Sequence, residues 1–431
     1  MSKIDGFYRA NSFHHSQNVK TLGEVIEIEH GFAFKGQYFT DDVSEDILLT
    51  PGNFAIGGGF KDDKLKYYNG PVDEKYVLKE GDLIVTMTDL SKMGDTLGYP
   101  ALVPASNEHR YLHNQRLGKI VLKDENILLK KYLYYFLRSP HYHSAILGSS
   151  TGTTVKHTSP TRIKDVEIDI PSLEIQYIVS ECLSKLDEAI INLRNLNHNL
   201  EKIIQLIFKS WFIDFDGQKE FVDSELGEIP KGWSVEFFGN ILTIMDFGTS
   251  GSFAALKDNI RFYYEPEYAI LVRAVDFNRN WSGDYVYTDK QGYNFSKKVN
   301  LQVGDVLLSN IGNVGTPFFA PDLEKPMTCG KNVLLIKTDD FKKNFVFSYL
   351  LSDIGQNTIR SILTGSAVPK FNKTDLKNTK LILPDEIMIR KFDKIVSPMQ
   401  TIIQKNNKRI SILEVILNHI LPKLLSGEIR V

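Results

Sequence analysis

TGTTVKHTSPTRIKDVEIDIPS, at residues 151–172, and TGSAVPKFNKTDLKNTKLILPD, at residues 364–385, are two copies of one passage. Matching residues fall at one constant offset of 213 positions: Thr151 and Thr364, Gly152 and Gly365, Val155 and Val368, Ile170 and Leu383, Pro171 and Pro384. Self-similarity at a fixed distance indicates that one structural module is used twice.

The repeat extends beyond this passage. TLGEVIEI, which begins at residue 21, resembles FFGNILTI, which begins at residue 237, and EGDLIVT at residue 80 resembles VGDVLLS at residue 303. The apolar β-branched runs after each Gly-Asp predict strands, and the two stretches ILLKKYLYYFLRSPHYHSAIL and NFVFSYLLSDIGQNTIRSIL predict helices. Each half is therefore expected to be a mixed α+β domain of roughly 170 residues.

Each copy of the passage is followed by a long heptad pattern. Stepping three and four residues from Ser172 onward gives Val179, Cys182, Leu186, Ala189, Leu193, Leu196, Leu200, Ile203 and Ile207. The same register after Pro384 gives Phe392, Ile395, Met399, Ile402, Asn406, Arg409, Leu413, Ile416 and Ile420. This spacing predicts two amphipathic helices with a coiled-coil seam.

The predicted helices are too long to be covered by one globular domain. About 37 residues at 1.5 Å each give roughly 55 Å of helix, so antiparallel pairing of the two helices is the economical solution. Asn406 and Arg409 in the seam would fix the register. The second helix has further apolar positions beside its seam: Val396, Ile403, Ile410 and Leu417. The alternatives are helices that belong to separate domains or that form a homodimer.

The predicted fold class is α+β, with two pseudo-repeated mixed α/β globular domains separated by two long helices that form an antiparallel coiled coil. We predict a first globular domain at residues 1–171 and a central helix at 172–213. A second globular domain is predicted at 214–384 and a C-terminal helix at 385–431.

Composition restricts the class of protein. The chain has 431 residues, 42% of them hydrophobic and 24% charged, which is ordinary for a globular protein. A formal net charge of −2 argues against a protein that coats nucleic acid without specificity. Cys182 and Cys329 are the only cysteines, which excludes a disulfide framework and favours a reducing compartment. With no apolar run that predicts a signal peptide or membrane span, a cytoplasmic location is expected.

Catalytic signatures are missing from the sequence. It contains no GxxxxGK[ST] phosphate loop and no Asn-Pro-Pro-Tyr or Asp-Pro-Pro-Tyr run of the kind that amino-methyltransferases use to hold a flipped base. His141 and His143 are two residues apart, which places them on different faces of a helix and argues against a metal site. We therefore predict a chain that is not an enzyme and holds no metal.

The repeated passage instead has the chemistry of a nucleic-acid interface. Hydroxyls, amides and cations are the groups that phosphates and base edges bind. Alternatively, Thr-Gly is only a turn before the next strand, the lysines are a solvated face, and nearby aromatic residues pack in the core. The candidate DNA-binding residues are Lys35, Thr151, Thr153, Thr154, Lys156, His157 and Arg162 in the first half, and Arg261, Tyr263, Ser366, Lys370, Asn372 and Lys373 in the second.

The arrangement resembles the specificity subunit of type I restriction-modification systems. The most specific stretches are NLEKIIQLIFKSWFIDFDG at residues 199–217, SELGEIPKGW at 224–233 and ILPKLLSGEIRV at 420–431. The Pro-Lys-Gly-Trp run of the second half has no counterpart before the first half, where NSFHHSQNVKTLG stands.

The resemblance implies a role in host defence and DNA methylation. Each half would be a target recognition domain that reads one part of a split site in double-stranded DNA. The helices would act as a spacer and as the docking surface for two modification (methyltransferase) subunits, which two ATP-dependent restriction subunits can join. No cofactor is implied in this chain, because methyl donor and ATP bind elsewhere in such a complex. The alternatives are a non-catalytic coiled-coil scaffold and an active methyltransferase or nuclease.

Overall fold

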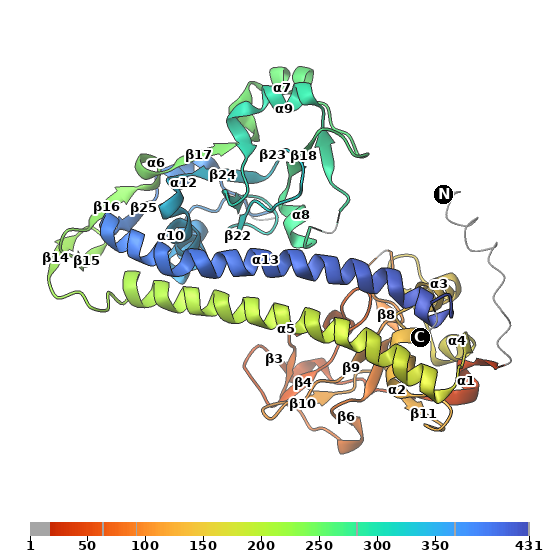
Figure 1. The fold of residues 1–431 in the computed structure, drawn as a ribbon. Helices are drawn as coiled ribbons and strands as arrows, with labels where there is room; N and C mark the ends of the chain where they lie inside the picture. The colour runs from red at the N-terminus through yellow and green to blue at the C-terminus, as the bar shows by residue number, and fades with distance from the viewer. Residues whose placement is uncertain (1–17, 63, 92, 282, 366–367, 430–431) are drawn as a thin grey trace. The chain divides into compact units, whose positions relative to one another are not determined.

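The structure is a computed structural model that describes residues 18–431 except 63, 92, 282, 366–367 and 430–431. The chain divides into two compact units (Figure 1). The first unit comprises Met1–Asn192 and Ile410–Val431, and the second comprises Leu193–Arg409. Both long helices cross the division, so each unit contains a globular part and a portion of each helix.

The first unit is built on two main sheets. Its strands are β1 (Val19–Thr21), β2 (Ile26–His30), β3 (Phe39–Thr40), β4 (Asp46–Leu48), β5 (Tyr67–Tyr68), β6 (Val77–Leu78), β7 (Leu83–Thr86), β8 (Thr88–Asp89), β9 (Pro100–Leu102), β10 (Arg110–Leu112), β11 (Leu117–Leu122), β12 (Lys156–His157) and β13 (Glu167–Asp169). Its helices are α1 (Leu22–Val25), α2 (Lys130–Phe136), α3 (Pro140–Ser149), α4 (Pro160–Lys164) and the first part of α5 (Leu173–Phe212), with 3-10 turns η1 (Gly36–Tyr38), η2 (Pro51–Asn53) and η3 (Glu74–Tyr76).

The strand orders of the first unit are β2-β11-β7-β9 and β3-β5-β4-β10-β6. The four-stranded sheet is antiparallel throughout, and the five-stranded sheet contains one parallel pair, β4 with β10. All four residues of β7 are buried, as its apolar LIVT sequence predicts. Two small ladders, β1 with β13 and β8 with β12, complete the unit.

The second unit repeats this plan. Its strands are β14 (Phe221–Ser224), β15 (Gly227–Pro230), β16 (Ser234–Phe237), β17 (Thr243–Asp246), β18 (Ala269–Val272), β19 (Val286–Thr288), β20 (Asn300–Leu301), β21 (Val306–Ser309), β22 (Pro317–Phe319), β23 (Met327–Cys329), β24 (Val333–Lys337) and β25 (Lys380–Leu383). Its helices are α6 (Phe238–Ile241), α7 (Phe253–Asn259), α8 (Ala274–Asn278), α9 (Lys290–Phe295), α10 (Asp340–Leu351), α11 (Asp353–Ser361), α12 (Lys373–Lys377) and the first part of α13 (Glu386–Leu425), with 3-10 turns η4 (Phe247–Ser250) and η5 (Lys297–Val299).

One four-stranded sheet in each unit matches the other strand by strand, whereas the second sheet has five strands in the first unit and four in the second. The order β17-β24-β21-β22 matches β2-β11-β7-β9, and the parallel pair β18 with β23 matches β4 with β10. The close contact between the first short helix and the later one is also duplicated: a Cβ at Gly23 would lie 3.1 Å from the Cβ of Lys164, and one at Gly239 would lie 3.1 Å from the Cβ of Lys377. The predicted class, two repeated mixed α/β domains with two long helices, is confirmed.

The two long helices run antiparallel. In the second unit Asn197 of α5 lies opposite Asn406 of α13, whereas Phe208 and Phe212, later in α5, contact Phe392, earlier in α13. Residue numbers therefore rise along one helix as they fall along the other. The division of the chain agrees, because the start of α5 and the end of α13 belong to the same unit.

The heptad prediction was half wrong, and in the same way in both helices. One set of predicted seam positions is buried or half-buried: Val179, Leu186, Leu193, Leu200, Ile207, Phe392, Met399, Asn406, Leu413 and Ile420. Most of the second set is exposed: Cys182, Leu196, Ile203, Ile395, Ile402, Arg409 and Ile416, with Ala189 half-buried. The buried positions lie one residue later: Leu183, Ile190, Asn197, Ile204, Val396, Ile403, Ile410 and Leu417.

The physical reason why the pattern pointed to the wrong row is a polar residue in the seam. Asn197 is 6% exposed and interrupts the truly buried row, whereas the exposed row is apolar at the equivalent level, with Leu196. The amide of Asn406 donates to Asn197 Oδ1 at 2.8 Å, and the amide of Asn197 donates to Asn407 Oδ1 at 2.8 Å. A buried amide whose hydrogen bonds are satisfied favours this one register over shifted ones. Asn406 thus has the position predicted for it, but Arg409 is on the outside.

No helix among the described residues is both long enough and apolar enough to cross a membrane.

Acid should destabilise the first unit through His113. This side chain is 3% exposed, and its Nε2 lies 3.0 Å from the Leu117 carbonyl oxygen. Burial lowers the pKa of His113 from 6.5 to about 4. The unfolded chain therefore takes up a proton below pH 6.5 that the folded unit excludes, and stability falls as the pH falls from 6.5 toward 4. We expect a loss of about 1 kcal/mol at pH 5.5.

The measurement is thermal or urea unfolding of wild type and His113→Gln at pH 7.0 and 5.5. The variant lacks this titration, so its stability should depend less on pH over this interval. An equal pH dependence in the two proteins would show that His113 does not contribute.

Candidate nucleic-acid interface

The first copy of the repeated passage forms a closed loop at the surface of the first unit. The backbone N–H of Thr151 donates to the His157 carbonyl at 3.0 Å, and the N–H of His157 donates back to Thr151 at 2.8 Å. Gly152 has a φ of +94°, and a Cβ there would lie 1.9 Å from a carbonyl oxygen of the same loop, so only glycine fits. The hydroxyls of Thr153 and Thr154 are thereby held on exposed residues at the tip.

The second copy has the same construction in the second unit. Thr364 and Lys370 exchange backbone hydrogen bonds of 2.8 and 2.9 Å, and Gly365 has a φ of +87°. We call residues 151–157 and 364–370 the paired loops. The paired loops share their closing hydrogen bonds and their left-handed glycine, although only a minority of their side chains match.

Each of the paired loops leads through a short helix and a strand into a long helix. Ser159 caps α4 and Asn372 caps α12, each through its side-chain oxygen. These short helices precede β13 and β25, which in turn precede α5 and α13. One alternative was that Thr-Gly is only a turn before the next strand. A strand does follow each Thr-Gly turn, but a capped helix lies between the turn and the strand.

Three of the predicted residues in the first unit come together. Arg162 donates from Nη1 to Thr151 Oγ1 at 3.3 Å, and Thr151 is bonded through its backbone to His157. The His157 ring nitrogen Nδ1 lies 3.2 Å from the Thr88 hydroxyl. Lys156, on the adjoining strand β12, is half-buried. The first loop and the helix α4 that follows it thus bring a guanidinium, an imidazole, an ammonium and several hydroxyls into one short segment.

The other predicted residues are spread over the two units. Lys35 is exposed and precedes η1, beside the five-stranded sheet rather than in the loop. Arg261 is exposed in the second unit, and the Tyr263 hydroxyl next to it donates to Asp289 Oδ2 at 3.0 Å. The sequence did not indicate that Tyr263 would be engaged in this way.

Near the second loop, two predicted residues have structural partners. The side-chain oxygen of Asn372 accepts two backbone N–H groups of α12 at 2.8 and 2.9 Å. The ammonium of Lys373 lies 2.9 Å from Asp246 Oδ1 and 3.1 Å from the Thr249 hydroxyl. These contacts compete with any contact to DNA, whereas Lys370 is exposed. Ser366 lies outside the described residues.

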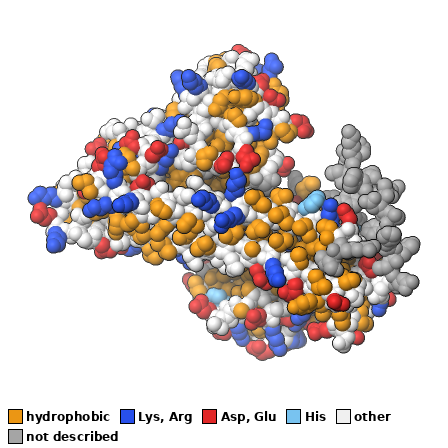
Figure 2. Space-filling model, viewed as in Figure 1, with side chains coloured by type: hydrophobic (Ala, Val, Ile, Leu, Met, Phe, Trp, Pro, Cys, Tyr) orange, Lys and Arg blue, Asp and Glu red, His pale blue; other side chains and the backbone are white. Residues whose placement is uncertain are grey.

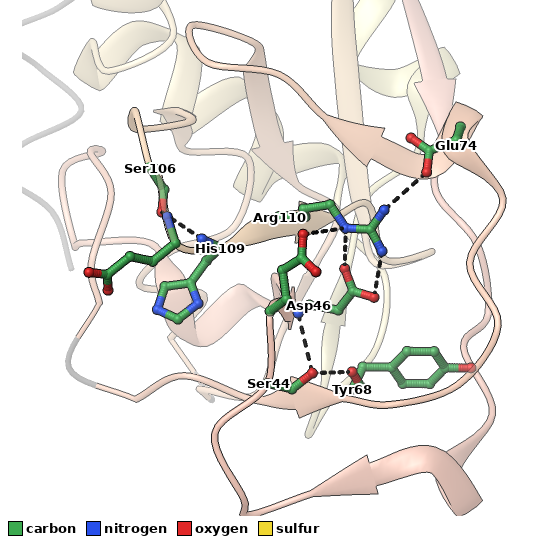
Figure 3. A network of polar contacts seen from close by, with 9 residues as sticks. Ser44, Asp46, Tyr68, Glu74, Ser106, His109 and Arg110 are labelled. Atoms are coloured by element: carbon green, nitrogen blue, oxygen red, sulfur yellow. Dashed lines mark hydrogen bonds and ion pairs between the residues drawn. The ribbon is translucent and has the colours of Figure 1, made fainter.

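A basic side chain on this fold is not in itself a phosphate ligand, as Arg110 shows (Figure 3). Its guanidinium binds Asp46 through two hydrogen bonds of 2.8 and 2.9 Å and Glu74 through a third of 3.0 Å. The hydrogen bonds with Asp46 raise the pKa of Arg110 further above its ordinary value. The guanidinium stabilises the parallel pairing of β4 with β10. Because carboxylates of the same unit already neutralise its charge, it is not available to bind a DNA phosphate.

A neighbouring segment that the sequence analysis missed adjoins the first loop. Lys156 and His157 of β12 pair with Asp89 and Thr88 of β8, at the start of the connection between β7 and β9. Burial would raise the pKa of Asp89, but hydrogen bonds from the backbone N–H groups of Ser91 and Thr96 outweigh it and keep that pKa below its usual value. The signal was a change in repeat offset, from 223 residues at Gly81 to 213 at Thr151, which marks extra residues in the first half.

Comparisons with known proteins agree on one family. A family model described as the type I restriction modification DNA specificity domain matches residues 16–202 and again residues 230–414. The type I restriction enzyme MjaIX specificity subunit of Methanocaldococcus jannaschii is 31% identical over 332 residues, which cover 74% of this chain and 73% of that protein. The EcoBI specificity subunit of Escherichia coli is 26% identical over 329 residues, which cover 70% of this chain and 62% of that protein.

Among solved structures, the S subunit of a type I restriction-modification system from M. genitalium has a similar fold. The TM-score is 0.52 at 17% sequence identity, and the match covers 94% of this chain and 95% of that one. At this identity the likeness concerns the fold alone.

Proposed function

Because this chain belongs to the type I restriction-modification DNA specificity family, we propose that each of its halves reads one part of a divided DNA target. As a specificity subunit it serves DNA recognition. In the proposed complex, methyl transfer and ATP-driven steps belong to other subunits, so the chain itself is not an enzyme and needs no cofactor.

The observation that supports two-part reading is the duplication of the paired loops. Both are closed by reciprocal backbone hydrogen bonds, contain a left-handed glycine, and lead through a capped helix into a long helix. Their exposed side chains differ at the closing position, where the first loop has His157 and the second has Lys370. A common scaffold with different surface chemistry is what two modules need in order to read different bases.

The long helices are proposed to set the distance between the half-sites and to bind two modification subunits, with two restriction subunits joining that core. The buried seam leaves apolar side chains exposed on both helices of the second unit: Leu196 at 45%, Ile203 at 43%, Ile395 at 40% and Ile402 at 43%. Figure 2 shows hydrophobic side chains along the long helices. Exposed apolar rows of this kind are typical of protein–protein interfaces.

The alternative, a coiled-coil scaffold that does not touch DNA, differs in its response to salt. If Lys156 and Lys370 contact phosphates, replacing either with alanine should weaken DNA binding and lower the slope of log K against log salt by about one unit. The measurement is a salt titration of DNA binding by the complex of this chain with its modification subunits.

Incubating the isolated chain with labelled methyl donor and DNA should give no methyl transfer.

Lys231 provides the matched control. Its side chain is 67% exposed and paired with Glu220 at 2.7 Å on the β14–β15 hairpin, outside the paired loops. Lys231→Ala removes the same charge and should leave the salt slope unchanged. If neither loop variant changes the slope while the complex still binds DNA, these two lysines belong to a solvated face.

A further inference from the structure

The connection between β7 and β9 is longer than its counterpart in the second unit. Gly98 donates from its N–H to the Thr86 carbonyl at 3.0 Å, and Gly315 donates to the Ser309 carbonyl at 2.8 Å, which aligns the two connections. The segment between the aligned residues has eleven positions in the first unit, 87–97, and five in the second, 310–314. We call residues 87–97 the inserted loop.

The inserted loop is held by internal hydrogen bonds. The buried carboxylate of Asp89 accepts the N–H of Ser91 at 2.6 Å, the N–H of Thr96 at 2.5 Å and the Thr96 hydroxyl at 2.9 Å. On its other side, the ring of His143 in α3 lies 3.2 Å from the carbonyl oxygen of Gly94. These contacts hold Asp89, Ser91, Gly94 and Thr96 in place within the inserted loop.

The inserted loop presents two large apolar side chains to solvent. Leu90 is 68% exposed and Met93 is 75% exposed. In the second unit the exposed residues of the corresponding turn are Gly312 and Asn313. The two halves thus differ at this place, because the described exposed residues are Leu90, Met93 and Asp95 in the first and Gly312 and Asn313 in the second.

The inserted loop is continuous with the candidate DNA interface. Its Asp89 pairs with Lys156 of β12, and Thr88, which begins β8, contacts the His157 ring at 3.2 Å. The loop therefore starts from the strand that borders the first of the paired loops. The inserted loop and the first of the paired loops are therefore neighbours along the ladder of β8 with β12.

We propose that Leu90 and Met93 read thymine by contact with its C5 methyl group in the major groove, an inference that rests on the proposed function. The thymine methyl is the one apolar group that a base edge presents there, and apolar side chains are its usual partners. Two solvent-exposed apolar side chains at the edge of a polar interface suit that group and do not bind a phosphate. Asn313 in the second half is instead suited to hydrogen-bond a base edge, as asparagine does with adenine.

The test removes the methyl group and leaves base pairing unchanged. In duplexes that contain the target of the full complex, as found by methylation mapping, each thymine of either strand is replaced in turn by deoxyuridine. At one or more positions in the half-site that the first half reads, we expect each replacement to weaken binding about fourfold, the effect of leaving one methyl group unburied. Leu90→Ala and Met93→Ala should bind the unmodified duplex more weakly and should lose this sensitivity to deoxyuridine.

Two matched variants complete the design. Val43→Ala truncates an apolar side chain that is 77% exposed outside the inserted loop, and it should retain full sensitivity to deoxyuridine. Asn313→Ala should weaken discrimination in the other half-site and leave the thymine effect intact.

If specific binding persists but no deoxyuridine position separates wild type from Leu90→Ala and Met93→Ala, the methyl contact is refuted while the proposed function stands. Loss of specificity for any divided site would overturn both.

Discussion

Exchange of residues 214–383 for the matching segment of a related specificity subunit is expected to replace one half of the recognised DNA site and leave the other half unchanged. The effect is large because a complete half-site changes at once. The duplicated fold is the reason: the second unit has its own sheets and its own copy of the paired loops. Under the proposed function, its reading of DNA is therefore expected to be independent of the first unit.

The structure adds a condition for this exchange to succeed. Phe208 and Phe212 of α5 and Phe392 of α13 remain in the hybrid, and Phe212 contacts Trp233 and Phe345 of the exchanged segment. Aromatic side chains make up much of this core, and replacing one of these rings with a small side chain would cost about 3–5 kcal/mol. The donor segment should therefore carry aromatic residues at the positions of Trp233 and Phe345.

Methylation mapping of cells that express wild type or hybrid with the modification subunits provides the measurement. The reciprocal exchange of residues 1–171 is the control, and it should change the opposite half-site. A single exchange that altered both halves would contradict independent reading.

Lengthening both long helices by one heptad is expected to increase the number of unread base pairs between the half-sites. Seven residues add about 10 Å of helix, which corresponds to at most about three base pairs along the duplex. The insertion must be made in both helices, because the hydrogen bonds of Asn197 with Asn406 and Asn407 fix the register of the pair. Suitable points are between Leu200 and Glu201 and, on the antiparallel partner, between Ile402 and Ile403.

The controls follow from the same geometry. A heptad in α5 alone leaves the asparagine hydrogen bonds and the packing of Phe208 on Phe392 unable to form together, so assembly should suffer. Four residues in both helices rotate the seam by about 40° and should also impair assembly. The readout is again methylation mapping with the modification subunits present. An active double-heptad variant with the original spacing would exclude the role of the helices as a spacer.

The missed row of the coiled coil shows what a heptad pattern leaves open. From Val179, steps to Cys182 or to Leu183 both give apolar residues, and both rows continue along the helix. The row that ends up buried is chosen by packing against the partner helix and the globular part of each unit. Burial of the Asn197 amide becomes acceptable only when a second amide from a residue 209 positions away satisfies it. The sequence of α5 alone does not show that Asn406 of the other helix is this partner.

The sequence predicted only part of the candidate interface. The repeat of Thr-Gly identified both of the paired loops. A residue with positive φ whose Cβ would meet a nearby carbonyl oxygen must be glycine, so this position is visible in the sequence. It did not separate exposed Lys370 from Lys373, whose ammonium is bound by Asp246, a residue 127 positions earlier in the chain. The inserted loop was visible only as a change in offset, without its conformation.

By itself the sequence determined the duplication, the mixed α/β class, the two long helices and the family, because each of these depends on local periodicity or on similarity between aligned segments. The tertiary structure alone decided which face of each helix is buried, which cations are already neutralised, and which side chains of the inserted loop reach solvent. These properties depend on groups that are distant in the chain and meet only after folding, where burial and hydrogen bonding determine what each side chain can still bind.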